Sequence, residues 1–386
     1  MIKRALISVW DKEGILELAQ FLNKNKIDIV STGGTAKYLK DNDIPVIEVS
    51  EITGMDAIMD GRVKTLNPKI FGGILADRNN KKHLEDLKSI DANTIDLIVV
   101  NLYPFVDEAI KNSLKMEKAI EYIDIGGPSM LRAAAKNYHS VCVLSNKSDY
   151  SEFINNFNSQ SMDIDIKSRK IFAARVFSRT SEYDNNIANY FNKDENLLDL
   201  DNQALHLSKF QDLRYGENPH QRASFYIDRN HNLDWSKYQG KKLSYNNYLD
   251  IGSGYEIVNQ FKNPSCSIIK HSNPCGFALG QNLLEAYKRA VSCDPISYFG
   301  GIVSFNFEVD AKLAEELIGP FLECIVAPSY SKEALNVFKK KKNLRVISIP
   351  HKTLINKYDI KSALGGYLFQ ERDSFKKDFN EYEIVT

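Results

Sequence analysis

Five short apolar runs alternate with amphipathic segments in the first part of the chain, and this alternation constrains the fold more than any other feature. The runs are predicted strands, at 4–10, 27–31, 46–49, 95–101 and 141–145. The segments between them, such as 14–23, repeat apolar residues with the period of a helix. Strands that alternate with helices are typical of a parallel α/β sheet. We therefore predict an α/β fold that begins with a parallel sheet.

The pattern changes after this sheet and predicts a second domain. Residues 148–190 are helical in pattern, and the helix is expected to cover the first domain or to meet a partner subunit. Its predicted buried stripe consists of Ile171, Ala174, Val176, Phe177, Tyr183 and Ile187. A polar, acidic stretch follows and is typical of a linker. We predict domains at 1–193 and 204–386, joined by a linker at 194–203.

The second domain resumes a mixed α/β pattern. Its predicted strands lie near 223–227, 267–270, 301–305 and 345–349. A short basic run at 339–342 is predicted to be solvated at a helix end. No internal repeat or long low-complexity tract interrupts the pattern, so the sequence predicts two ordinary folded domains.

Composition narrows the classes of function. The chain has 386 residues, of which 43% are hydrophobic, and this is enough for two or three cores. Lys plus Arg equals Asp plus Glu at 50 each, so no global positive field attracts nucleic acid or an anionic membrane. No apolar run approaches the length of a membrane span or a secretory core. We predict a cytoplasmic protein whose anionic ligands are small.

The cysteines favour neither disulfides nor a metal site. There are five, an odd number, and they are scattered, so reduced thiols are expected. His271 and Pro274-Cys275 are similar to half of a nucleotide-deaminase zinc site. The second cysteine of that site is replaced by Ala278, and no His-x-Glu precedes it. We therefore expect no metal requirement.

Lys270-His271 closes an apolar run and opens into Ser272-Asn273-Pro274-Cys275-Gly276. A neighbouring ammonium disfavours imidazolium, so His271 is predicted to stay neutral and able to accept a proton. A neutral base suits attack by a weak amine nucleophile. The ordinary alternative, a surface lysine beside a partly buried histidine, is the commoner outcome for an isolated pair.

Polar clusters in the first part point to an anionic ligand. Thr32-Gly33-Gly34-Thr35 joins a predicted strand to a helix, where backbone N–H groups can hold a phosphate, although a ligand-free tight turn explains it equally well. The loop at 61–68 combines two cations with a hydroxyl and an amide; its alternative is a solvated basic loop. Lys136, near a predicted helix end, also has an ordinary role in complementing the helix dipole.

These clusters together resemble the bifunctional purine biosynthesis protein family. Arg62-Val63-Lys64-Thr65-Leu66, Asn101-Leu102-Tyr103-Pro104-Phe105, Asp124-Ile125-Gly126-Gly127 and Arg132-Ala133-Ala134-Ala135-Lys136-Asn137 resemble its IMP cyclohydrolase domain. Leu213-Arg214-Tyr215-Gly216-Glu217-Asn218-Pro219-His220-Gln221 and the segment from Lys270 to Gly276 resemble its formyltransferase domain. The motifs occur in order over the whole chain and are highly specific as a set.

The resemblance implies a fold and an activity. The fold is a methylglyoxal-synthase-like parallel sheet domain followed by a cytidine-deaminase-like α/β formyltransferase domain without the zinc. In this family, 10-formyltetrahydrofolate formylates the ribotide AICAR, and formyl-AICAR then closes to IMP with loss of water. The expected small-molecule partners are thus the ribotides and the folate. The resemblance also implies a homodimer, and whether a monovalent cation is bound stays open.

The resemblance also implies residue roles. For ring closure, Lys64 and Lys136 would stabilise oxyanion character, and Tyr103 and Asp124 would order the amide and relay protons. For formyl transfer, His271 would take the proton of the ring amine, and Lys270 would keep it neutral or assist the departing folate. The predicted substrate-binding residues are Lys12, Ser31, Gly33, Gly34, Thr35, Arg62, Thr65, Asn101, Arg214, Tyr215, Phe299, Gly300 and Glu323.

The sequence departs from the family pattern at three points. Asn67 replaces the usual histidine, which keeps hydrogen bonding but loses titration. Trp10 stands where serine is often found, near the phosphate loop. Family members also continue for roughly another domain beyond Thr386. We therefore expect a second domain that is incomplete at its C-terminus, which leaves formyl transfer by this chain in question.

Two alternatives follow. Residues 200–386 could serve as a non-catalytic dimerisation or substrate-holding module, with a cyclohydrolase as the only working enzyme. A methylglyoxal-synthase-type lyase would share the first fold, but it would need only the first domain, and the second set of motifs counts against it.

Overall fold

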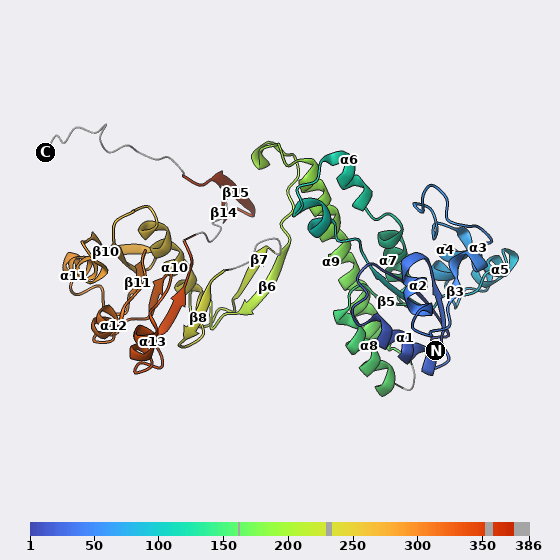
Figure 1. Ribbon diagram of the computed structural model, residues 1–386, viewed down its shortest axis with the longest axis horizontal. Helices are drawn as coiled ribbons and strands as arrows, with labels where there is room; N and C mark the ends of the chain where they lie inside the picture. Colours follow the sequence, from blue (N-terminus) through green and yellow to red (C-terminus); the bar gives the residue numbers. More distant parts are fainter. Residues whose placement is uncertain (161–162, 229–233, 352–357, 374–386) are drawn as a thin grey trace. The chain divides into compact units, whose positions relative to one another are not determined.

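The computed structural model describes residues 1–160, 163–228, 234–351 and 358–373. The chain folds as two units, Met1–Asp201 and Asn202–Thr386, each with its own sheet (Figure 1). The predicted boundaries at 1–193 and 204–386, and the assignment of one activity to each domain, remain predictions. Along the described ranges, no helix is both long and apolar enough to cross a bilayer.

The first unit is built on a five-stranded parallel sheet, as the sequence predicts. Its order is β3-β2-β1-β4-β5, and every neighbouring pair is parallel. The strands are shorter than predicted by one or two residues, because pairing does not extend to every end of the apolar runs. Their bounds are β1 Arg4–Val9, β2 Asp28–Ser31, β3 Ile47–Glu48, β4 Leu97–Asn101 and β5 Cys142–Leu144.

Helices pack around this sheet and complete its core. The helix α2 contacts β1, α1 contacts β2, and α7 contacts β4 and β5. Central strand residues such as Leu6, Ile98 and Val143 are fully buried. The helices are α1 Ile15–Lys24, α2 Gly33–Lys40, α3 Val49–Thr53, α4 Pro68–Leu75, α5 Lys81–Ser89, α6 Met116–Ala119, α7 Gly126–Lys136, α8 Ser148–Ser159 and α9 Ile166–Phe191, with short π and 3-10 turns at Val106–Ile110, Ile120–Tyr122 and Leu197–Asp199.

The predicted stripe on α9 is wrong in half of its positions. Val176 and Tyr183 are buried and Ile187 is half-buried, but Ile171, Ala174 and Phe177 are exposed. The inward face instead follows Arg169, Phe172, Ala173, Val176, Thr180, Tyr183, Asn186 and Tyr190. Polar residues occupy part of the buried face, so the apolar period alone gives the wrong orientation for this helix.

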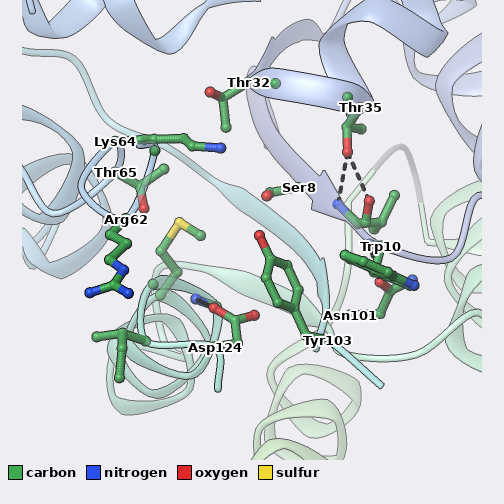
Figure 2. Close-up of a pocket in the computed structure, with 18 of the residues that line it drawn as sticks. Ser8, Trp10, Thr32, Thr35, Arg62, Lys64, Thr65, Asn101, Tyr103 and Asp124 are labelled. Carbon is green, nitrogen blue, oxygen red and sulfur yellow. Dashed lines mark hydrogen bonds between the residues drawn. The ribbon is translucent and has the colours of Figure 1, made fainter. Parts of the chain in front are cut away.

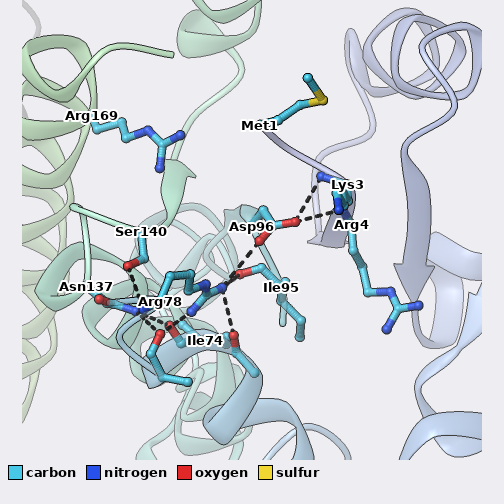
Figure 3. Close-up of polar contacts among 12 residues, drawn as sticks. Met1, Lys3, Arg4, Ile74, Arg78, Ile95, Asp96, Asn137, Ser140 and Arg169 are labelled. Atoms are coloured by element: carbon cyan, nitrogen blue, oxygen red, sulfur yellow. Dashed lines mark hydrogen bonds and ion pairs between the residues drawn. The ribbon is translucent and has the colours of Figure 1, made fainter. Parts of the chain in front are cut away.

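Arg78 ties the end of α4 to the sheet (Figure 3). Its guanidinium donates hydrogen bonds to the carbonyls of Gly73 (3.1 Å) and Ile95 (2.7 Å), and also to that of Ala76. Asp96 accepts a further bond from Arg78 and accepts the backbone N–H groups that begin β1. From the end of α7, the Asn137 amide donates to the carbonyls of Ile74 (2.8 Å) and Ala76 (3.0 Å). The ends of α4 and α7 and the starts of β1 and β4 are thus joined by one polar network.

The second unit has a six-stranded mixed sheet in the order β10-β9-β11-β12-β13-β8. The strands β11, β12 and β13 are parallel, whereas β9 is antiparallel to both of its neighbours. The sheet strands are β8 Ser236–Gln239, β9 Ser265–Lys270, β10 Asn273–Leu279, β11 Ile302–Phe305, β12 Cys324–Ala327 and β13 Arg345–Ser348. Two separate hairpins pair β6 Leu207–Asp212 with β7 Ser224–Asp228, and β14 Tyr358–Ala363 with β15 Gly366–Glu371.

Alternate strand residues of this sheet enter two different cores. Val303 packs with residues of α11, α12 and α13, whereas its neighbour Ile302 packs with residues of α10. Successive side chains of a strand point to opposite faces, so the sheet is covered on both sides. The helices are α10 Tyr245–Val258, α11 Leu283–Cys293, α12 Ala311–Leu317 and α13 Lys332–Phe338.

Candidate active site

A cavity of about 810 Å³ opens beyond the carboxyl ends of β1, β2 and β4 (Figure 2). The chain runs from β1 outward to β2 and β3, and then returns to the other side of β1 for β4. The cavity therefore lies at the topological switch point, where open parallel sheets bind their ligands. The predicted site residues that line it are Lys12, Gly33, Gly34, Thr35, Arg62, Lys64, Thr65, Asn101, Tyr103 and Asp124.

Two helices begin at this cavity. Gly33 and Gly34 open α2, and Gly126 and Gly127 open α7. A helix N-terminus presents unpaired N–H groups and a partial positive charge. Two such ends, with a lysine between them, form a setting that favours an anionic ligand.

Lys64 brings a free ammonium to the same cavity. Its Nζ lies 3.5 Å from the position that a Cβ on Gly33 would occupy, so the ammonium stands against the start of α2. Gly61, with φ 88°, leaves room for the lysine stem, because a Cβ there would lie 2.8 Å from Lys64 Cε. Within the described ranges, no hydrogen bond or ion pair of this ammonium is found, so its three donors are available to a ligand.

Asp124 is a half-buried carboxyl whose pKa is raised by its partial burial. Hydrogen bonds from the backbone N–H groups of Gly127 and Tyr103 and the charge of Lys64 oppose the shift. Oδ1 of Asp124 accepts the Gly127 N–H at 2.8 Å. The backbone N–H of Asp124 donates to the Tyr183 hydroxyl at 2.7 Å, which anchors this turn to α9. A carboxyl with a raised pKa can both accept and release protons nearer to neutral pH.

Tyr103 stands beside Asp124. Burial raises the pKa of its phenol, and the Asp124 charge adds to the shift, so the hydroxyl is held in its protonated form. In Figure 2 the hydroxyl is directed toward Ser8. Lys64, Tyr103 and Asp124 thus bring an ammonium, a phenol and a carboxyl from three separate segments to one cavity.

Three of the predicted phosphate ligands make hydrogen bonds within the protein in this structure. The Thr35 hydroxyl donates to the Val9 carbonyl (2.9 Å) and accepts the Val9 N–H (3.1 Å). The Lys12 ammonium donates to the carbonyls of Val9 and Trp10 and to Thr35, and burial lowers its pKa. Ser31 is fully buried and donates to the Ile7 carbonyl at 2.7 Å, so it does not reach the cavity. Of this set, only the backbone of Gly33 and Gly34 is left to face a phosphate.

Lys136 also lies away from the cavity. It is the last residue of α7, whose first residues line the cavity, and a helix rises about 1.5 Å per residue, so its backbone stands about 15 Å from Gly126. Its side chain is exposed. The structure therefore does not bring Lys64 and Lys136 together, although their motifs suggest a pair of oxyanion-stabilising groups.

The remaining predicted residues of this part take varied positions. Arg62 pairs with Glu121 across the cavity mouth, and this hydrogen bond raises the pKa of the exposed guanidinium. Thr65 is buried, with its hydroxyl 3.1 Å from the position of a Cβ on Gly126. Asn67 caps α4 by accepting the Lys69 N–H at 2.9 Å, which accounts for the hydrogen bonding expected there.

Several lining residues were not among the predicted ligands. They are Ser8, Trp10, Thr32, Asp60, Glu121, Gly126 and Gly127. Ser8 and Thr32 lie at the ends of β1 and β2, and Gly126 and Gly127 begin a helix. Their positions at strand ends and helix starts could have identified these residues from the sequence, because strand ends and helix starts meet at the switch point of a parallel sheet.

The second unit has a cavity of about 460 Å³ with a cationic lining. Of the predicted site residues it contains Arg214 and Glu323. Its other charged lining residues are Lys241, Lys340, Lys341, Lys342 and Arg345. The basic run at 339–342 is exposed at the end of α13 Lys332–Phe338, as predicted, and Lys340–Lys342 also line this open cavity. Glu323 is ion-paired with Arg345, whose side chain is almost fully buried.

Phe299, Gly300 and Tyr215 lie next to this cavity rather than in its lining. Phe299 contacts Phe321, a lining residue, with ring centroids 5.2 Å apart. The Gly300 N–H donates to the Phe321 carbonyl at 2.8 Å. The Arg214 guanidinium stands over the Tyr215 ring at 5.3 Å. One edge of the cavity is therefore built from the predicted segments, but through intermediary residues.

Lys270 and His271 occupy the tip of the β9–β10 hairpin. The Lys270 ammonium donates to the carbonyls of Phe299 (3.0 Å) and Ser297 (3.4 Å). His271 and Ser272 form the two-residue turn, with φ 53° and 63°. Both values are in the left-handed region, which is costly for residues other than glycine and which a two-residue type I′ hairpin turn requires at both positions. Neither residue lines the cationic cavity, although Lys270 is joined to its edge through Phe299.

Metal-binding clusters were sought over the same described ranges. No group of three or more His, Cys, Asp or Glu side chains in them is arranged to hold a metal ion.

Comparison with known proteins identifies the family. Residues 14–129 match the family model of the MGS-like domain, and residues 134–386 match that of the AICARFT/IMPCHase bienzyme. The Bifunctional purine biosynthesis protein PurH of Clostridium acetobutylicum is 47% identical, and the match covers 100% of this chain and 76% of that protein. The PurH proteins of Fusobacterium nucleatum and Brachyspira hyodysenteriae are 48% and 47% identical, with 100% of this chain and 76% and 77% of theirs covered.

A solved structure described as "Crystal structure of ForH" is 29% identical, with a TM-score of 0.43, and covers 49% of this chain and 96% of its own. The prediction of an MGS-like domain followed by a domain of the AICARFT/IMPCHase family is confirmed by the two family models. The assignment of cyclohydrolase chemistry to residues 1–193 and of formyl transfer to residues 204–386 stays a prediction. The chain belongs to the AICARFT/IMPCHase bienzyme family, the bifunctional AICAR formyltransferase and IMP cyclohydrolase enzymes of purine biosynthesis.

Proposed function

We propose that the cavity of the first unit is the site at which formyl-AICAR closes to IMP. The observation that carries this assignment is the convergence of Lys64, Tyr103 and Asp124 on one cavity that also receives two helix N-termini. The catalytic groups provide a cation, a phenol and a carboxyl. The helix ends provide a place for the phosphate of a ribotide.

The chemistry of closure matches these groups. The carboxamide nitrogen attacks the formyl carbon, a C–N bond forms, and the formyl oxygen gains negative charge. Lys64 stabilises this oxygen, because its ammonium has no competing partner in the described structure. Asp124 accepts the proton released by the attacking nitrogen, and Tyr103 donates a proton to the oxyanion, which gives a carbinolamine. The Asp124 proton then passes to this hydroxyl, the C–O bond breaks and water leaves. At the same time the formamido nitrogen gives its proton to the Tyr103 phenolate and the ring C=N bond forms, so both side chains return to their starting states. The proton balance closes without any further reagent.

The phosphate belongs at the start of α2 in this proposal. Gly33 and Gly34 offer backbone N–H groups there, and Thr32 adds a hydroxyl at the cavity wall. In this structure the polar groups of Lys12 and Thr35 are hydrogen-bonded to Val9 and Trp10, so they would meet the phosphate by exchanging those bonds. Arg62, at the cavity mouth, is placed to meet the sugar-phosphate side of the ligand.

The test is the rate of IMP formation when the purified chain receives formyl-AICAR without folate. We expect catalysis, and we expect Lys64→Ala to lower kcat by about 10²-fold or more while the fold is unchanged. Lys37→Ala is the matched control, because Lys37 is an exposed lysine of α2 that does not line the cavity. Full activity in the Lys64 variant would overturn the assignment.

A second site in the second unit is supported by its cationic cavity. We propose that Arg214 and its neighbouring lysines hold the AICAR phosphate there, and that His271, held in a left-handed turn, takes the proton of the ring amine. The formyl donor is then 10-formyltetrahydrofolate. His271→Ala is expected to abolish formyl transfer in any preparation that performs it and to leave closure unchanged. Loss of closure with an intact fold would contradict the assignment of two sites.

Other parts of the proposal rest on family membership alone. They are a homodimeric assembly, a cytoplasmic location, chemistry that needs no metal, and an optional monovalent cation. Light scattering of the purified chain tests the first of these. Activity that is unchanged after exhaustive chelation would support chemistry without a metal. Activity measured after the addition of single monovalent salts tests the monovalent cation.

A further inference from the structure

Asp250, in α10, holds the turn that carries His271. Its Oδ1 accepts the backbone N–H of Ser272 at 2.6 Å, and the residue is only 9% exposed. We call the segment Lys270–Asn273 the histidine turn. The strand ladder pairs Lys270 with Asn273, so the N–H of Ser272 lies outside the ladder. The carboxylate supplies a partner for this N–H from a different element of the fold.

Three hydrogen bonds, spaced four residues apart along α10, set this helix in register with β9 and the histidine turn. The Ser265 hydroxyl donates to the Val258 carbonyl at 3.2 Å, and the Ser267 hydroxyl donates to the Gly254 carbonyl at 3.1 Å. The bond from the histidine turn to Asp250 is the third. Residues four apart lie on one face of a helix, so the face of α10 that packs on β9 also places the carboxylate at the turn.

The helix lies directly on the sheet at Gly254. A Cβ on this glycine would stand 2.4 Å from Ser304 Oγ and 3.2 Å from Ile269 Cγ1. The backbone of α10 therefore approaches β9 and β11 as closely as a glycine allows. A carboxylate carried by this helix is held in a fixed place relative to the strand that leads into the histidine turn.

The start of α10 is joined to the other segment that was predicted to bind AICAR. The Tyr245 N–H donates to the Tyr215 carbonyl (3.2 Å), and the Asn246 amide donates to the Glu217 carbonyl (3.2 Å). The Arg214 N–H donates to the chain just before the helix. The first turns of α10 are thus bound to the 214–217 segment and, through its carboxylate, to the histidine turn.

The histidine turn needs such an anchor because of its backbone. His271 and Ser272 have φ values of 53° and 63°, which are costly for residues other than glycine. On one side, the Lys270 ammonium holds the turn to the carbonyls of Ser297 and Phe299. Asp250 holds it to the helix. A displacement of about 1 Å of a catalytic group can cost on the order of 10²-fold in rate, so these anchors bear on the chemistry.

We propose that Asp250 is a positioning residue for formyl transfer, which fixes the histidine turn on α10 and so sets the place of the His271 imidazole relative to the Arg214–Tyr215 segment. This inference rests on the proposed second site, in which His271 takes the proton of the ring amine. It gives a role in the reaction to a buried carboxylate that was not among the predicted site residues.

The test is formyl transfer from 10-formyltetrahydrofolate to AICAR by the full chain. Asp250→Ala is expected to lower kcat about 10²-fold with KM for AICAR changed less than about threefold, because the imidazole is misplaced while the binding groups remain. Asp250→Asn is expected to recover most of the rate, because its amide oxygen can still accept the Ser272 N–H. Glu256→Ala is the matched control, since this carboxylate of α10 pairs with Arg372 instead, and it should keep the wild-type rate.

Ser272→Gly in the Asp250→Ala background separates a local role of the carboxylate from a general one. Glycine adopts a left-handed φ without steric cost, so the turn keeps its shape with less help from the carboxylate. We expect about tenfold of the lost rate to return. If Ser272→Gly returns none of it, Asp250 supports the helix and not the turn, and the inference is overturned.

Failure of the second site and failure of the positioning role give different results. A wild-type chain that transfers no formyl group, or a His271→Ala variant as active as wild type, would remove the site and the inference with it. If wild type is active and His271→Ala is inactive, the site stands. Full activity of Asp250→Ala, or a loss confined to KM, would then overturn the positioning role alone.

Discussion

The carboxylate of Asp124 and the backbone of Gly127 are in close contact at the start of α7. One carboxylate oxygen accepts the Gly127 N–H at 2.8 Å, and the other lies 2.2 Å from the position that a Cβ on Gly127 would occupy. A side chain at residue 127 and this placement of Asp124 are therefore mutually exclusive. The glycine is required here for the carboxylate and not for an unusual backbone angle.

Gly127→Ala tests this relationship. The added methyl must displace the carboxylate, so we expect kcat for closure to fall on the order of 10²-fold. Stability should change little, because alanine is favoured over glycine inside a helix by about 1 kcal/mol, and this offsets part of the clash. The control is Gly252→Ala in α10, where a Cβ meets nothing within 4 Å. A Gly127 variant with normal kcat would show that Asp124 need not stand where the structure places it.

Asp124→Asn is expected to inactivate closure while making the protein more stable at neutral pH. The folded-state pKa of Asp124 lies above its ordinary value of 3.8 because of burial. Ionisation of this group therefore costs folding free energy above the folded pKa, and the cost disappears as pH falls below 3.8. Loss of a general base commonly costs about 10²–10⁴-fold in rate.

The measurement is the melting temperature of wild type and Asp124→Asn across a pH series. The difference should be largest near pH 7 and should shrink toward acid pH. Asp184→Asn, an exposed carboxylate of α9, should show no such trend. A variant that is less stable than wild type at pH 7 would mean that the hydrogen bonds of the carboxylate outweigh the cost of its burial.

Lys341 and Lys342 are expected to bind an anion in the cavity of the second unit. Replacing both by alanine should weaken AICAR binding by about tenfold at low salt, because two phosphate-facing charges are lost, and the difference should narrow as ionic strength rises. Titration calorimetry at two salt concentrations measures both effects. The double variant Lys312→Ala/Lys332→Ala removes two exposed lysines that do not line the cavity, and it should bind normally. Equal weakening of AICAR binding in the two double variants would indicate that the lysines attract the anion by their overall charge and that the cavity is not a specific site.

Arg78→Met is expected to destabilise the first unit. The guanidinium donates to the carbonyls of Gly73, Ala76 and Ile95 and pairs with Asp96, so its loss removes these bonds and leaves Asp96 without its cation. The carbonyls of Gly73 and Ala76 keep one donor each, the Ile95 N–H and the Asn137 amide. We expect a loss of about 3 kcal/mol in the free energy of unfolding, measured by chemical denaturation. Arg78→Lys should recover part of this, since it keeps the charge but not the forked geometry. A loss below about 0.5 kcal/mol for Arg78→Met would show that water replaces these bonds.

The order of strands and helices in the first unit could be predicted from the sequence because it is written in local patterns. Apolar runs mark the strands, polar residues occur within the first three positions after β1, β2 and β4, and glycines open α2 and α7. Parallel strands bring their carboxyl ends to one edge, so Lys12, Gly33, Asn101 and Tyr103 were predicted correctly to lie near one another.

The use of each side chain could not be predicted in this way. Asn101 and Lys12 were predicted to bind the substrate, and in this structure their polar groups are hydrogen-bonded to the turn that follows β1. The orientation of α9 was misjudged because polar residues such as Arg169 and Thr180 share its buried face. Lys136 follows a motif that begins at the cavity, but one helix length separates it from that cavity.

The sequence by itself determined the fold class, the resemblance to a family and the segments that supply the site, because these depend on periodicity, turn chemistry and strand ends within short stretches. The tertiary structure alone decided which polar groups are free to meet a substrate and which are used within the protein. That division depends on hydrogen bonds between residues about 90 positions apart, such as Trp10 with Asn101, and no local pattern contains them. Each donor can be used only once, so packing decides whether a polar side chain supports the fold or the chemistry.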